Sequence, residues 1–144
     1  MGKILSINIS TRKGEKKTRV QTAVLKENHG IVGDAHAGDW HRQVSLLAAD
    51  SVDKMRGRGV ELHPGDFAEN LTIEGIDLKC LKIGQRLKIG SEIILEITQI
   101  GKECHDGCAI KQQVGDCVMP REGVFARVIK GGEIKTGDQI NFEI

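Results

Sequence analysis

The chain has 144 residues, of which 21 are Lys or Arg and 20 are Asp or Glu, so its formal net charge is +1. A nearly balanced charge offers no general attraction for nucleic acid or a membrane surface, and an aromatic content of 3% leaves few rings for base stacking. Ile (17) and Val (10) exceed Leu (10) and Ala (8), and 18 residues are Gly, which favours strands joined by turns. We therefore expect one mostly β domain over residues 1–144 that binds neither nucleic acid nor a membrane.

The beginning of the chain predicts two strands separated by a basic loop. Residues 3–10 alternate between apolar and polar, and the apolar side chains on one face are Leu5, Ile7 and Ile9. The basic, glycine-containing segment 11–18 is expected to be a solvated loop, although it would also suit docking of an acidic partner. Residues 20–24 then indicate a second strand.

The rest of the chain predicts further short strands and one short helix. Ala49, Val52 and Met55 have helical spacing, whereas other apolar runs are short or alternate. Gly-Asp pairs begin at residues 33, 38, 65, 115 and 137 and suit corners between strands. Many short strands with frequent turns predict a closed or partly closed β-barrel with one to three short helices. The expected strands lie at 44–47, 67–73, 81–90, 91–100, 124–129 and 137–144.

The segment from Gly30 to Arg42 has the composition of an anion-binding loop. Gly33 and Gly38 permit tight turns that bring backbone amides close to an anion, and the Arg42 guanidinium can grip a phosphate. Asp34, His36 and His41 could instead hold a metal ion, and a histidine in a turn can also be purely structural. Further along, Glu69 and Asn70 could read the edges of a heterocycle or cap a turn.

The four cysteines are expected to be thiols in a reducing cytoplasm, because the sequence shows no secretory or membrane-spanning segment. Cys104 follows a predicted strand and has Lys102 and His105 beside it, and nearby cations favour the reactive thiolate. A second interpretation is a structural zinc site formed by Cys104, His105, Cys108 and Cys117. Cys80, between leucines, is better suited to a buried position.

Several of these motifs together resemble the MOSC domain, the family named after the C-terminal part of molybdenum cofactor sulfurases. The resemblance is carried by Gly-Asp-x-His-x-Gly at 33–38, Arg-Gln-Val-Ser-Leu-Leu at 42–47, and Pro-Gly-Asp-Phe-Ala-Glu-Asn-Leu at 64–71. It continues through 81–90 and 95–104. These stretches occur in the family's order, and the chain looks like a small, stand-alone bacterial-type member.

The resemblance implies a barrel like that of the pyruvate kinase barrel domain and a role with molybdopterin-type cofactors. It implies that Cys104 carries sulfur as a persulfide or ligates molybdenum, and that the cofactor binds near Gly33, Asp34, His36, Gly38, Arg42, Glu69 and Asn70. Arg121 is a second candidate anion contact. The thiol-rich segment after Cys104 departs from the family pattern, so Cys108 could resolve a persulfide.

The resemblance also implies partners. A chain of 144 residues cannot contain an aminotransferase-like domain, so no pyridoxal phosphate is expected and a partner cysteine desulfurase would load the sulfur. Molybdoenzymes or cofactor-biosynthesis proteins would be the acceptors. The sequence leaves open whether the domain is a sulfurtransferase enzyme, a non-enzymatic module that hands over molybdopterin, or a zinc-stabilised structural domain. It also leaves open whether the barrel forms a homo-oligomer.

Overall fold

The computed structural model describes residues 2–11, 17–49, 69–76, 78, 81–100 and 123–142. Every element bounded within this part is a strand, which confirms a mostly β fold. The strands are β1 (Gly2–Ile9), β2 (Thr18–Val20), β3 (Thr22–Lys26), β4 (Gly30–Ile31), β5 (Val44–Ala48), β6 (Leu71–Glu74), β7 (Arg86–Ile89), β8 (Ile93–Ile100), β9 (Val124–Lys130), β10 (Gly132–Lys135) and β11 (Gln139–Phe142).

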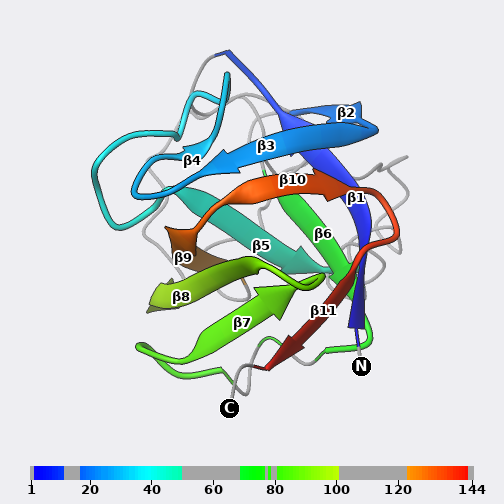
Figure 1. The fold of residues 1–144 in the computed structure, drawn as a ribbon, viewed down its shortest axis with the longest axis vertical. Helices are drawn as coiled ribbons and strands as arrows, with labels where there is room; N and C mark the ends of the chain where they lie inside the picture. The colour runs from blue at the N-terminus through cyan, green and yellow to red at the C-terminus, as the bar shows by residue number, and fades with distance from the viewer. Residues whose placement is uncertain are drawn as a thin grey trace, which may run out of the picture.

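Seven of these strands close into a barrel (Figure 1). The order is β11-β7-β8-β9-β5-β6-β1, and β1 pairs back onto β11 through Gly2 and Ile140, so the sheet closes on itself. The β5–β6 pair is parallel and the other neighbours are antiparallel. Closure leaves the barrel strands no open edge between β1 and β11, and β2 extends the sheet beyond β1. The predicted closed barrel is confirmed.

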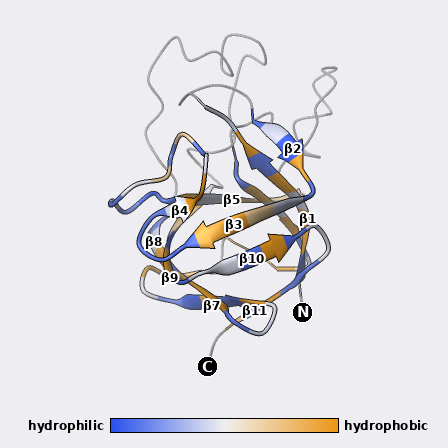
Figure 2. Ribbon diagram, turned by 45° about the horizontal axis from the view of Figure 1, so that its top comes forward, coloured by the Kyte–Doolittle hydropathy of each residue, from blue (hydrophilic) through white to orange (hydrophobic). Residues whose placement is uncertain are grey.

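A second sheet of three strands, in the order β10-β3-β4, adds to the core. β10 and β3 run side by side across the barrel strands in both ribbon views (Figures 1 and 2). The sheet contributes Leu25, Ile31 and Ile134 to the same buried cluster as the barrel interior. The alternation of hydrophobic and hydrophilic residues along the strands can be followed in Figure 2.

The outer face of the barrel near β5 is also buried. Val44 and Leu46 of β5 belong to the core cluster, and the alternation of a strand therefore turns Ser45 and Leu47 to the other face. Leu47 is nevertheless fully buried, as is Phe125 of β9, which lies opposite Ser45, and neither belongs to the core cluster. This covered face carries the polar residues described below.

The structure corrects one residue of a predicted face and leaves the predicted helix untested. On β1 the prediction is confirmed for Ile7, which is fully buried, and for Ile9, which packs against the core. It is wrong for Leu5, which is half-buried, because Ile4 points inward instead. The reason is a shift in the pairing of β1 with β6 between Ile4 and Ser6, which reverses the alternation. Residues 50–55 of the predicted helix lie outside the described residues. In the described part of the chain, no helix has the length and apolarity to cross a membrane.

Candidate functional site

The segment after β4 forms a tight, internally bonded corner. The amide of Asp34 donates to the carbonyl of Ile31 (3.1 Å), and Gly33 between them has a φ of 90°, as the third residue of a type II turn requires. The amides of residues 34 to 38 all donate within the protein, to Ile31, Ser10, Asp34 or His29. The amides expected to cradle an anion along 34–38 therefore already have acceptors within the protein.

Three ionisable side chains meet beneath this corner. Lys17 Nζ lies 2.8 Å from Asp34 Oδ1, 3.0 Å from His36 Nδ1 and 3.1 Å from Ser10 Oγ. The side chains of Lys17 and Asp34 are fully buried, and that of His36 is 14% exposed. The backbone amides of Ser10 and His36 also donate to the Asp34 carboxylate, at 3.1 and 3.0 Å. The Lys17–Asp34 ion pair is thus balanced in charge and makes several further hydrogen bonds, as a buried ion pair must.

The surroundings of Asp34 keep its carboxyl ionised. Burial alone would raise the pKa of Asp34, because it disfavours the charged form. The neighbouring His36 side chain, the hydrogen bond and charge of Lys17, and the Ser10 amide outweigh that effect and hold the pKa of Asp34 well below its usual range. Asp34 is therefore an anion at any ordinary pH, and the ammonium of Lys17 neutralises its charge.

The end of the segment presents a guanidinium among aromatic rings. Arg42 Cζ lies 4.7 Å from the centroid of the Trp40 ring and 5.8 Å from that of Phe125, within the range of cation–π attraction. Trp40 donates from Nε1 to the His36 carbonyl (2.6 Å) and stacks nearly parallel to the His36 ring. Thr98 of β8 donates to the His41 carbonyl, which ties the segment to the barrel. Within the described residues, the buried Nε of Arg42 has no hydrogen-bond partner.

Glu69 and Asn70 immediately precede β6 and belong to a buried polar network. Asn70 Oδ1 accepts from the Ser45 amide (2.9 Å), and Asn70 Nδ2 donates to the Asn8 carbonyl (3.1 Å). Asn8 Nδ2 donates to the Glu69 carbonyl (3.2 Å), and Thr72 Oγ1 donates to Glu69 Oε2 (2.8 Å). The side-chain amide of Asn70, which lies next to β6, therefore links that strand to β5 through Ser45 and to β1 through Asn8. A ligand-binding role for Glu69 and Asn70 stays a prediction.

The end of β1 brings the two predicted clusters together. The Ser10 amide donates to the Asp34 carboxylate, and the Ser10 carbonyl accepts from the Ala35 amide. Two residues earlier, Asn8 donates from Nδ2 to the Glu69 carbonyl and accepts from Asn70 Nδ2 at its own carbonyl. Gly38 donates to the His29 carbonyl (2.7 Å) and closes the same corner. Gly33, Asp34, His36, Gly38 and Arg42 thus form one continuous unit.

Sequence reasoning missed Lys17, because a lysine in a basic, glycine-containing stretch is normally solvated. The expectation of a solvated loop is wrong at this residue, which is 4% exposed and paired with Asp34. Residues 12–16 of that loop lie outside the described residues, as do Cys80, Cys104, His105, Cys108, Cys117 and Arg121. No described group of three or more His, Cys, Asp or Glu could hold a metal ion, so a metal held by Asp34, His36 and His41 gains no support.

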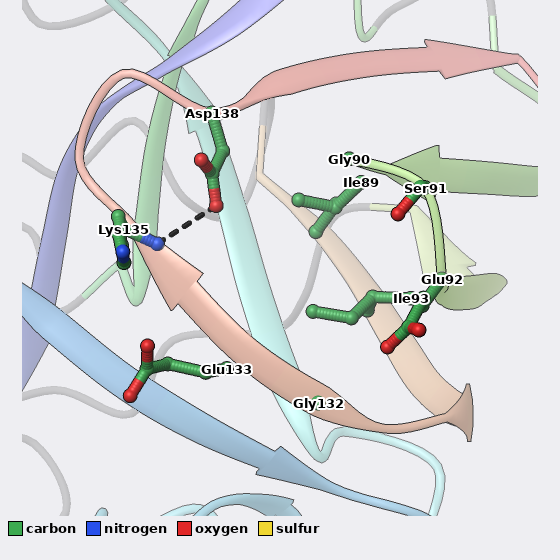
Figure 3. A pocket seen from close by; sticks show the side chains of 9 residues that line it. All are labelled: Ile89, Gly90, Ser91, Glu92, Ile93, Gly132, Glu133, Lys135 and Asp138. Carbon is green, nitrogen blue, oxygen red and sulfur yellow. Dashed lines mark hydrogen bonds between the residues drawn. The ribbon is translucent and has the colours of Figure 1, made fainter.

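A separate hollow of about 330 Å³ lies between two hairpin turns (Figure 3). It is lined by the β7–β8 turn and by residues of β10 and the β10–β11 turn, and none of the predicted site residues lines it. Its acidic groups are Glu92, Glu133 and Asp138, and Asp138 accepts the Lys135 amide (2.8 Å) as a turn cap. The acidic residues of this hollow are exposed or cap a turn, whereas the Gly33–Arg42 corner contains a buried ion pair.

Solved structures share this fold. YuaD from Bacillus subtilis is 21% identical, with a TM-score of 0.80 over 97% of this chain and 94% of that one. YiiM from Geobacillus stearothermophilus is 20% identical, with a TM-score of 0.77 over 100% of this chain and 76% of that one. YiiM from Escherichia coli is 15% identical, with a TM-score of 0.72 over 100% of this chain and 70% of that one. At these identities the likeness concerns the fold alone.

Sequence comparison assigns the family. A search of curated proteins found no match to this sequence. The sequence model of the MOSC domain matches residues 33–141, which begins at the Gly33 turn and extends into β11. This span covers most of the chain and includes Arg42, Asn70 and Cys104. The chain therefore belongs to the MOSC domain family, a family linked to the molybdenum cofactor.

Proposed function

We propose that this protein binds a molybdopterin-type cofactor beside the Gly33–Arg42 corner and carries sulfur on Cys104. The family supports the cofactor class, and the observation that carries the binding site is the half-buried Arg42. Its Nε is buried without a hydrogen-bond partner in the described part of the chain, although such a donor is costly to leave unsatisfied. A phosphate of the cofactor would satisfy that donor.

The residues present fit an anionic, planar ligand. Trp40 and Phe125 flank the Arg42 guanidinium and limit its movement, so less side-chain entropy is lost when Arg42 grips a phosphate. The half-buried His36 adds a polar ring stacked on Trp40. In this proposal Arg42 and His36 contact the cofactor. Asp34 and Asn70 do not contact it but fix the positions of Lys17 and of the β1 and β5 backbone around the site. The bound cofactor would supply a molybdenum centre for sulfur or oxygen chemistry.

Cys104 is proposed to carry the sulfur. Its thiolate attacks the outer sulfur of a persulfide on a partner cysteine desulfurase, a new S–S bond forms on Cys104, and the partner's cysteine thiolate leaves. The cations Lys102 and His105 in sequence beside Cys104 favour the attacking thiolate. The persulfide would then pass to a molybdoenzyme or to a cofactor-biosynthesis protein. A reducing cytoplasm would suit this chemistry.

The test of sulfur carriage is intact-protein and peptide mass spectrometry after incubation with a cysteine desulfurase and cysteine. We expect an added mass of one sulfur on the peptide that contains Cys104, and its loss in Cys104→Ser. Cys80→Ser is the matched control and keeps the added sulfur. Loading of Cys104→Ser at the wild-type level would overturn the assignment.

The hand-over module without a covalent step is the second candidate, because the described site consists of binding groups. Molybdopterin binding that survives both Cys104→Ser and thiol alkylation, together with no sulfur loading, would favour it. Elemental analysis of the purified protein tests the zinc alternative, which needs about one zinc per chain bound to its thiolates.

A further inference from the structure

The Lys17–Asp34–His36 cluster defines the protonation of the site histidine. A lysine ammonium has three donors and no acceptor, and Lys17 Nζ is within 3.1 Å of Ser10 Oγ, Asp34 Oδ1 and His36 Nδ1. An ammonium that contacts a ring nitrogen at 3.0 Å donates to it, so Nδ1 must carry a lone pair rather than a hydrogen. The neutral imidazole then carries its hydrogen on Nε2.

The opposite assignment, a neutral Lys17 beside a protonated His36, is disfavoured by the ordinary acidity of the two groups. Their unperturbed pKa values, about 10.4 for Lys and 6.5 for His, place the proton on the lysine by about four units. Asp34 Oδ1 is 2.8 Å from Lys17 Nζ, whereas its Oδ2 is 3.8 Å from His36 Nδ1, so the carboxylate also favours the charge on Lys17. Ser10 Oγ, 3.1 Å from Lys17 Nζ, accepts another hydrogen bond from the ammonium.

We propose that Lys17 is a positioning residue of the site, which holds His36 as a neutral imidazole whose Nε2–H is an obligate hydrogen-bond donor. This inference rests on the proposed function for what His36 would bind, namely an anionic or carbonyl oxygen of the cofactor. Trp40 complements Lys17, since it donates to the His36 carbonyl and stacks on the ring, so both the tautomer and the plane of the imidazole are set. Asp34 keeps the Lys17 charge in place.

The test uses ¹⁵N-labelled full-length protein and two-bond ¹H–¹⁵N NMR spectra of the histidine rings. We expect the His36 ring to show an unprotonated Nδ1 and a protonated Nε2 between pH 6 and pH 8. Lys17→Met removes the donor, and we expect the ring to become a mixture of tautomers. An Nδ1–H ring in the wild type, or an unchanged Nε2–H ring in folded Lys17→Met, overturns the proposal.

Two further measurements separate this inference from the proposed function. The double variant Lys17→Met/Asp34→Asn removes both charges, and it serves if Lys17→Met alone does not fold; the tautomer is expected to change in it as well. Molybdopterin binding is then compared between Lys17→Met and the exposed-lysine control Lys26→Met, with an expected loss of about tenfold only in the former. If no variant or wild type binds molybdopterin, the proposed function fails while the NMR result still decides the role of Lys17.

Discussion

The Gly33–Arg42 corner and the hollow between the β7–β8 and β10–β11 turns hold similar residue types in opposite arrangements. In the corner, Asp34 and Lys17 are fully buried and within 2.8 Å of each other. In the hollow, Glu92, Glu133 and Lys135 are exposed, and Asp138 caps a turn. Exposed charges cost little to maintain, whereas buried charges need compensating partners. The difference shows that the proposed site is marked by buried, compensated charges and not by the hollow in the surface.

The largest difference between the two regions is expected when one carboxylate is removed from each. Asp34→Ala leaves the Lys17 charge buried without its partner, and we expect a loss of about 3–5 kcal/mol in the free energy of unfolding. Asp138→Ala removes one exposed turn cap and should cost about 0.5–1.5 kcal/mol. Urea unfolding at pH 7 measures both. Equal losses would contradict the distinction between the regions.

The buried network around Asn70 should respond next most strongly. Asn70→Ala leaves the Ser45 amide and the Asn8 carbonyl without this partner, and each buried group left unsatisfied costs about 1–3 kcal/mol. We therefore expect a loss of at least about 2 kcal/mol in urea unfolding. Gln139→Ala, at an exposed position of β11, is the control and should change the stability by less than about 0.5 kcal/mol. A loss for Asn70→Ala no larger than for Gln139→Ala would show that the network is dispensable.

The dependence of stability on pH should also reflect the buried charge of Asp34. The pKa of Asp34 is lower in the folded protein than its ordinary value of about 3.9, so below pH 5 the unfolded chain binds a proton that the folded protein does not. This contribution is complete above about pH 5 and is lost progressively as the pH falls. The Lys17→Met/Asp34→Asn variant lacks it, so its unfolding free energy should fall less steeply than wild type between pH 5 and pH 3. Equal slopes of unfolding free energy against pH for the wild type and the variant would contradict this prediction.

Arg42→Lys should have the smallest effect on folding and a selective effect on binding. Lysine keeps the charge but loses the planar fork that can lie between Trp40 and Phe125 and hold a phosphate with two hydrogen bonds. We expect unfolding to change by less than about 1 kcal/mol and molybdopterin affinity to fall about tenfold. Arg86→Lys, at an exposed position of β7 outside the corner, is the matched control. A binding constant unchanged by Arg42→Lys would remove Arg42 from the site.

Much of the fold could be predicted because alternating apolar residues leave a local signature. Ile93, Leu95 and Ile97, at alternate positions of the predicted strand 91–100, are all buried. Gly33 and Gly137 at predicted corners have φ values of 90° and 97°, which only glycine adopts readily. The inward position of Ile4 in place of Leu5 could not be predicted, since the shift between Ile4 and Ser6 depends on the register of β1 with β6. Strands as short as Gly30–Ile31 also have too few residues for a pattern.

The β-rich core, the glycine corners and the motifs of the MOSC family could be predicted from the amino-acid sequence, because each depends on residues close together in the chain. The contacts of the polar residues became known only from the folded structure. In the sequence Lys17 has the pattern of a solvated lysine, but the fold places it 2.8 Å from Asp34. The hydrogen bonds of Asn70 to Ser45 of β5 and Asn8 of β1 likewise cannot be predicted from its neighbours in the sequence. The burial and pairing of a charge depend on segments distant in sequence, which no local pattern records.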